Sequence, residues 1–130
     1  MSEETVEIVR KAVAHFESLA PPDWSLLHQE IELYGHDLLD AGPYHGHVGY
    51  VRWLHDWLDA WSESRMEAEE FIDTGDRVVV VFRVSATGRD SGITFQHENA
   101  FVYATQDGSV NRIDYFNSKQ QALRAVGLER

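Results

Sequence analysis

Val78-Val79-Val80-Val81-Phe82 is the stretch of sequence that decides the fold, and it lies inside the segment 77–87. β-Branched and aromatic side chains favour a strand. Successive side chains of a strand point to opposite faces, so five consecutive apolar residues leave both faces apolar. We therefore expect a central strand that is covered on both sides.

The segments around this strand predict an antiparallel meander. Glycine-containing turns at 74–76, 88–92 and 107–108 separate the strands, and Asp107-Gly108 is a strong hairpin signal. The expected long strands are residues 65–73, 77–87, 93–106 and 109–116. A short earlier strand is expected at 31–34, where apolar and polar residues alternate briefly.

Helices are predicted before and after the meander along the sequence. A first amphipathic helix is expected over 2–19, ended by Pro21-Pro22, and a short one over 23–29 with Asp23 as its cap. Ser118 and Gln121 form a capping box for a last helix. That last helix is expected over 119–126, ended by the glycine at 127.

A tryptophan-rich helix is predicted over 47–62. Steps of about 100° per residue bring the rings of one face almost into line; these rings are Tyr50, Trp53, Trp57 and Trp61. So wide an aromatic face predicts that the helix lies across the sheet.

Length and charge restrict the class of protein. The 130 residues predict a single domain over 1–130, and the absence of cysteine excludes disulfides. The 22 acidic residues outnumber the 11 basic ones, and a formal net charge of -11 disfavours nucleic acid and anionic membranes as partners. The acidic start Met1-Ser2-Glu3-Glu4 is unlike a secretory signal, so we expect a cytoplasmic location.

Together these elements predict an α+β domain with helices packed on one side of a curved antiparallel sheet. The central strand then needs a cover on its other side. A second copy of the chain is the simplest cover, so we expect a homodimer through the outer face of the sheet.

Several segments resemble the SnoaL-like branch of the nuclear transport factor 2-like superfamily, and together they span nearly the whole chain. They are Tyr44-His45-Gly46-His47, Arg52-Trp53-Leu54-His55-Asp56-Trp57-Leu58, Phe71-Ile72-Asp73-Thr74-Gly75-Asp76-Arg77-Val78-Val79, Gly88-Arg89-Asp90-Ser91-Gly92, Asp107-Gly108-Ser109-Val110-Asn111-Arg112-Ile113-Asp114-Tyr115-Phe116, Ala122-Leu123 and Gly127-Leu128. The resemblance implies a cone-shaped curved sheet wrapped around helices, the cystatin-like roll, which encloses a pocket and is often dimeric. Members of the superfamily include polyketide cyclases, ketosteroid isomerases, dehydratases and epoxide hydrolases as well as proteins without known activity, so function must be argued from the site.

Asp114 is the first candidate for chemistry, because it lies in the last long strand between bulky apolar neighbours. Desolvation raises the pKa of a carboxylate that faces an apolar cavity, and a raised pKa suits a general acid or base. The alternative is that Asp114 points outward on a solvated face or pairs with Arg112.

The epoxide hydrolases of this superfamily use two aspartates and an arginine. The resemblance matches Asp114 to one aspartate and Arg83 to the arginine, but Ser85 stands where the second aspartate would be. Because water activation and protonation of the leaving oxygen need two groups, epoxide hydrolysis fits this chain less well. Arg83 would hold Asp114 ionised or bind an anionic ligand, and its alternative is a salt bridge at an edge or interface.

His97 and Asn99 share one face of the strand 93–106 with the rings of Phe95, Phe101 and Tyr103. A few polar groups among aromatic rings are typical of a site that orients a mostly apolar ligand, and histidine moves protons near neutral pH. The alternative is that this face lies in the dimer interface, with His97 hydrogen-bonded and inert.

Further side chains are expected to line the pocket. His47, at the start of the tryptophan-rich helix, is either a hydrogen-bonding group of the site or a structural contact of the helix start. Trp53 or Trp57 should form a wall, because a helix cannot fill a concave sheet completely. The residues expected at the pocket mouth, in or beside the loop 36–46, are Tyr34, His36 and Tyr44.

No metal or other cofactor is expected. Five of the seven histidines fall between His28 and His55, but no helical i,i+4 histidine pair and no His-Glu-x-x-His motif occurs.

The sequence therefore indicates two candidate functions. In the first, Asp114 and His97 move a proton on a small apolar substrate, in a cofactor-independent isomerisation, cyclisation or dehydration. In the second, the chain is a non-catalytic module that binds a small ligand or a partner through the same fold. The change Asp114→Asn should abolish turnover in the first case and alter only affinity in the second.

Overall fold

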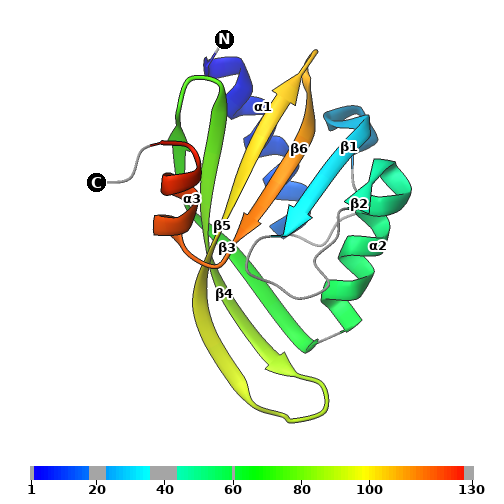
Figure 1. Cartoon of the computed structure of the whole chain (residues 1–130). Coiled ribbons are helices and arrows are strands. Elements are labelled where there is room, and N and C mark those ends of the chain that lie inside the picture. Colours follow the sequence, from blue (N-terminus) through cyan, green and yellow to red (C-terminus); the bar gives the residue numbers. More distant parts are fainter. Residues whose placement is uncertain (1, 18–22, 36–43, 60, 128–130) are drawn as a thin grey trace.

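The computed structural model describes residues 2–17, 23–35, 44–59 and 61–127, and side chains within 4–15, 23–35, 44–56 and 65–127. It contains three helices, a single 3₁₀ turn and six strands, so the predicted α+β class is confirmed (Figure 1). The elements are α1 (Ser2–Glu17), η1 (Trp24–Leu26), β1 (Leu27–Gly35), β2 (Tyr44–His45), α2 (Gly46–Asp59), β3 (Trp61–Asp73), β4 (Arg77–Gly88), β5 (Thr94–Gln106), β6 (Ser109–Phe116) and α3 (Lys119–Ala125).

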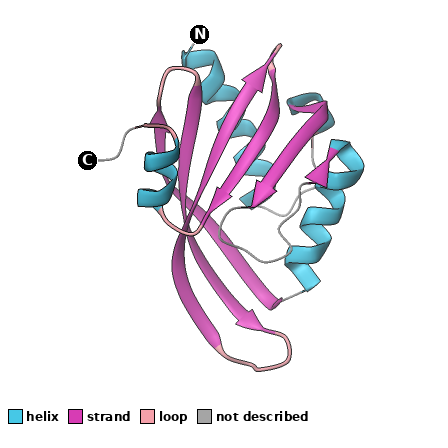
Figure 2. Ribbon diagram, viewed as in Figure 1, coloured by secondary structure: helices cyan, strands magenta, loops and turns pink. Residues whose placement is uncertain are grey.

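The strands form one curved, open sheet in the order β2-β1-β6-β5-β4-β3 (Figure 2). Strands β3 to β6 are the predicted antiparallel meander. Strand β1, however, runs parallel to β6, with Leu33 beside Ile113 and Tyr34 beside Asp114. The sheet is therefore mixed, which corrects the expectation of a wholly antiparallel one.

The apolar run of β4 is buried on both faces, as predicted, and none of its five side chains is more than 3% exposed. Val78, Val80 and Phe82 belong to the larger core cluster with α1 and α2. Val79 and Val81 belong to a smaller cluster with α3. We call the first side of the sheet the inner face and the second side the outer face.

The cover on the outer face comes from the same chain. The Ser118 hydroxyl accepts a hydrogen bond from the Gln121 backbone N–H at 3.2 Å and starts α3 as predicted. Ala122 of α3 is fully buried against the outer-face cluster, and Leu123 packs beside it. The central strand thus needs no second copy to cover it, and the homodimer stays a prediction without that argument.

Two predicted helices are shorter than expected. Helix α2 ends at Asp59, and Trp61 begins β3, so Trp61 does not continue the aromatic line of the helix. The expected helix over 23–29 is a single 3₁₀ turn, in which the Asp23 side chain accepts from the Ser25 backbone N–H at 3.0 Å. Strand β1 already begins at Leu27, where apolar residues of the inner face start.

Both residues of the β5–β6 turn have positive φ, 53° at Asp107 and 83° at Gly108. Such a pair matches the twist of a two-residue hairpin. The β4–β5 hairpin is longer and projects away from the three helices (Figure 1). Among the described residues, no helix has the length and apolar character needed to cross a membrane.

Candidate functional site

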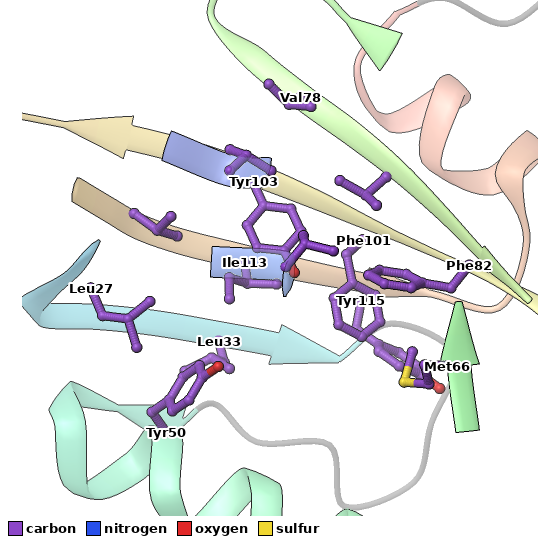
Figure 3. Close-up of a cluster of buried hydrophobic side chains, with 14 of the residues drawn as sticks. Leu27, Leu33, Tyr50, Met66, Val78, Phe82, Phe101, Tyr103, Ile113 and Tyr115 are labelled. Atoms are coloured by element: carbon purple, nitrogen blue, oxygen red, sulfur yellow. The ribbon is translucent and has the colours of Figure 1, made fainter. Parts of the chain in front are cut away.

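Aromatic rings gather on the inner face around Phe101 of β5, which is fully buried (Figure 3). The centroid of its ring lies 4.9 Å from that of Phe82 on β4 and 5.0 Å from that of Tyr115 on β6. Trp53 of α2 approaches Phe101 from the helical side at 5.8 Å. The neighbouring Tyr103 is also buried. The rings predicted at Trp53, Phe101 and Tyr103 therefore meet on one side of the sheet.

A chain of three polar side chains crosses this aromatic face. His97 Nε2 lies 2.7 Å from Asn99 Oδ1, and Asn99 Nδ2 donates to the Tyr115 hydroxyl at 2.9 Å. Alternation along β5 and the pairing of Phe101 with Tyr115 bring these side chains to the same face. His97 is exposed, whereas Asn99 and Tyr115 are buried. The chain of hydrogen bonds therefore leads from solvent into the core.

The Tyr115 hydroxyl is the inner end of this chain. Burial raises its pKa, and the hydrogen bond from Asn99 lowers the pKa by a smaller amount. The hydroxyl consequently stays protonated at neutral pH and is available as a donor. A donor held among apolar rings can stabilise negative charge that develops on a ligand oxygen.

Asp114 lies on the outer face, away from His97 and Asn99. Its carboxylate accepts from Arg112 Nε at 2.8 Å and from Arg112 Nη2 at 3.0 Å. The hydrogen bonds to Asp114 raise the pKa of Arg112, whose guanidinium also lies 4.3 Å above the Tyr34 ring. The Tyr34 hydroxyl in turn donates to Glu32 at 2.8 Å. The structure thus brings Asp114 together with Arg112 and Tyr34, and separates it from His97.

Arg83 is on the outer face as well, in an ion pair with Glu69 at 3.0 Å. Ser85 follows two residues later on the same face, opposite Arg65 of β3. Arg83 is exposed and meets neither Asp114 nor the inner-face residues in the contacts of the described chain. The geometry therefore matches the salt-bridge alternative for Arg83.

Two further predicted pocket residues, His47 and Tyr44, make their contacts around helix α2. His47 Nε2 is 2.9 Å from the Leu27 carbonyl oxygen, and its ring stacks on Trp24 at 4.4 Å, which are contacts of a helix start. The Tyr44 hydroxyl donates to Asp56 at 2.8 Å, within the β2–α2 region. Two predictions fall outside the described part of the chain: His36, and the side chain of Trp57.

The enclosed pocket stays a prediction, because the segment expected at its mouth includes residues 36–43, which the structure does not describe. Within the residues that it does describe, no three histidine or acidic side chains come together as a metal site.

Tyr115 is the functional candidate that sequence reasoning missed. The signal was the alternation of β6, in which Ile113 and Tyr115 are apolar or aromatic and Arg112 and Asp114 are charged. Neighbouring side chains of a strand point in opposite directions, so the prediction that Asp114 faces the pocket placed Tyr115 on the wrong face.

Comparison with known proteins decides the family. Residues 9–113 match the SnoaL-like domain, which is well over half of the chain. The chain belongs to the SnoaL-like family. No curated protein matches its sequence.

Solved structures agree with this SnoaL-like assignment at the level of the fold. An NTF2-like protein of unknown function from Burkholderia pseudomallei superposes with a TM-score of 0.78 at 19% identity, covering 95% of this chain and 97% of that one. A putative SnoaL-like polyketide cyclase from Jannaschia gives 0.76 at 15% identity, with coverages of 99% and 95%. TerC, co-crystallised with polyporic acid, gives 0.77 at 21% identity, with coverages of 95% and 98%. At such identities the likeness shows the fold alone.

Proposed function

We propose that this SnoaL-like domain binds a small, largely apolar molecule on its inner face and moves a proton on it without a cofactor. The reaction class is isomerisation, cyclisation or dehydration. The observation that carries the proposal is the hydrogen-bonded chain His97–Asn99–Tyr115, which sets an exposed imidazole and a buried hydroxyl on one aromatic face. Asp114 is no longer the acid–base group in this proposal, because Arg112 holds it on the outer face.

A proton-transfer step needs a base at carbon and a donor at oxygen. In the proposed step, His97 removes a proton from the carbon beside a carbonyl group, and the electron pair of that C–H bond forms a carbon–carbon double bond. The Tyr115 hydroxyl stabilises the enolate oxygen by a hydrogen bond. Return of the same proton from His97 to another carbon completes an isomerisation, and its transfer to a neighbouring hydroxyl, which then leaves as water, completes a dehydration.

Relatives of the same fold support a ligand of this kind, since one is named a putative polyketide cyclase and another was co-crystallised with polyporic acid. The character of the inner face supports it too, because the rings of Phe82 and Phe101, rather than charged groups, surround Tyr115. The absence of a cofactor and the cytoplasmic location remain predictions.

The test uses 2-acetylnaphthalene, a planar ketone with exchangeable methyl protons beside its carbonyl group. We expect the protein to accelerate deuterium exchange of these protons in D₂O, followed by proton NMR. His97→Gln should slow the exchange about 100-fold, as for loss of a general base. Tyr115→Phe should slow it at least about tenfold through loss of the oxygen donor. The matched control is His55→Gln, an exposed histidine of α2, which should leave the rate unchanged.

A non-catalytic ligand-binding module is the second candidate. It is favoured by the position of Asp114, because this buried carboxylate faces away from the aromatic rings of the inner face. Binding of 2-acetylnaphthalene, seen as chemical-shift changes at Phe101 and Tyr115, with exchange no faster than in buffer would support this candidate and overturn the enzyme. Equal exchange rates in wild type and His97→Gln would also overturn the proposed base.

A further inference from the structure

Asn99 is fully buried, and within the described chain only Asn99 and Asp114 are buried among the polar residues that carry an amide or a charge. Burying an amide costs free energy unless hydrogen bonds replace those to water. Both ends of the Asn99 side chain are used, one by His97 and one by Tyr115. Its backbone neighbour across the β4–β5 ladder is Phe82, so the amide lies among rings.

The direction of each hydrogen bond follows from the chemistry of the amide. Asn99 Nδ2 donates to the Tyr115 oxygen, so Oδ1 is the end that faces His97. A carbonyl oxygen only accepts, and therefore His97 Nε2 must carry a proton. In the neutral imidazole the lone pair then resides on Nδ1, which makes no hydrogen bond within the described part of the chain.

The same logic orients the tyrosine. Because the Tyr115 oxygen accepts from Asn99, its own proton points elsewhere, and no acceptor for it occurs among the described residues. The stacking of His97 on Phe95, with centroids 5.1 Å apart and planes 19° apart, holds the imidazole plane. One amide thus leaves a basic nitrogen at one end and a donor proton at the other.

We infer that Asn99 is a positioning residue, which fixes His97 in the Nε2–H tautomer and turns the Tyr115 proton away from the amide. This inference rests on the proposed function for its purpose, but its geometry stands apart from any ligand. Asn99 would not touch the reacting atoms. It would act by deciding which atom of His97 is the base and which atom of Tyr115 is the donor.

Few charges compete with the amide for control of His97. In the strand ladder, the row that contains His97 continues through Val84 to Met66, which are both uncharged. Glu98, the next residue on β5, points to the outer face, where it accepts from the Lys119 backbone N–H at 2.9 Å. From β6, Tyr115 faces the same amide and is protonated at neutral pH.

The test is proton–nitrogen NMR on the full-length chain with ¹⁵N-labelled histidine and no ligand. We expect neutral His97 in the Nε2–H form. In Asn99→Asp the new carboxylate should raise the titration midpoint of His97 by about one pH unit or more, a tenfold change in proton affinity. The matched control is Asn117→Asp, the same change at an exposed asparagine after β6, which should leave the midpoint of His97 in place.

A predominant Nδ1–H tautomer in wild type would overturn the inference, and so would a folded Asn99→Asp variant with an unmoved midpoint. If Asn99→Asp does not fold, the wild-type tautomer alone decides. Because these spectra need no ligand, their result is independent of the deuterium exchange that tests the proposed function.

Discussion

The Asp114 carboxylate and the Tyr115 hydroxyl are neighbours in the chain but belong to opposite faces of the sheet. The Asp114 carboxylate accepts two hydrogen bonds from the Arg112 guanidinium, and the Asp114 side chain is 11% exposed. Such a bidentate pair holds a carboxylate ionised and occupied, which suits a structural role. Tyr115 has one hydrogen bond, and its proton remains available. The two residues are buried to a similar extent, and they differ in their hydrogen-bond partners.

From this we predict that Asp114→Asn lowers the free energy of unfolding by about 1–3 kcal/mol, because it weakens two charge-assisted hydrogen bonds. Deuterium exchange of 2-acetylnaphthalene should remain at the wild-type rate. Urea denaturation followed by circular dichroism measures the first effect, with the exposed turn residue Asp90→Asn as the control. Loss of exchange at unchanged stability would instead restore Asp114 as the catalytic acid or base.

The alternation of charge along β6 could have been used to predict which residues of this strand face the core. The charged side chains of Arg112 and Asp114 alternate with Ile113 and Tyr115, and a pair of opposite charges two residues apart can neutralise itself on one face. What the sequence could not supply is the partner of each group. Whether Asp114 meets Arg112 or His97 depends on rotamers and on strands that are distant in the sequence.

At the scale of elements, β4, β5 and β6 could be predicted to within one residue because their signals are local, whereas β3 begins at Trp61, four residues before the predicted start at 65. The turns at Gly75 and Asp107-Gly108 and the capping box of α3 each act within a few residues. The parallel pairing of β1 with β6 is not local, since it joins Tyr34 to Asp114 across most of the chain. Alternating apolar residues define a face but not the direction of a distant neighbour.

The Tyr50 hydroxyl of helix α2 is a titratable group whose pKa depends on the packing of the helix against the sheet. Tyr50 is 6% exposed, and burial raises its pKa to about 12 from the ordinary tyrosine value of 10.0. The folded state therefore holds this proton more tightly than the unfolded state. Below pH 10 both states are neutral at Tyr50, and between pH 10 and 12 the unfolded state loses the proton first, so stability falls as pH rises.

We accordingly predict an alkaline loss of about 3 kcal/mol that depends on Tyr50, from two pH units at about 1.4 kcal/mol each. Tyr50→Phe should show a correspondingly shallower decline between pH 10 and 12, measured by urea denaturation at several pH values. Tyr44→Phe is the control, because its hydroxyl donates to the exposed Asp56. Identical declines in wild type and Tyr50→Phe would mean that α2 does not keep this hydroxyl out of water.

At the scale of the whole molecule, α3 divides the outer face into two parts. Its helix covers the apolar cluster around Val79 and Val81. Beside this cluster, over β3 and β4, the outer face is polar and carries the ion pairs of Arg65 with Glu67 and Arg83 with Glu69. A second copy docked on the outer face would therefore meet charged side chains rather than the bare apolar sheet. Exposed ion pairs of this kind add little stability to a single chain but influence which surfaces associate.

The predicted homodimer through the outer face thus requires Arg83 to lie at or near the seam. Arg83→Glu would bring a third carboxylate beside those of Glu67 and Glu69. The repulsion should weaken the dimer, and we expect its dissociation constant to rise about tenfold or more, which is about 1.4 kcal/mol. Sedimentation velocity over micromolar concentrations measures it. Arg52→Glu makes the same charge change on exposed α2, on the other side of the sheet, and should leave the association unchanged. A wild-type chain that sediments as a monomer, or a dimer equally weakened by both changes, would contradict a homodimer through the outer face.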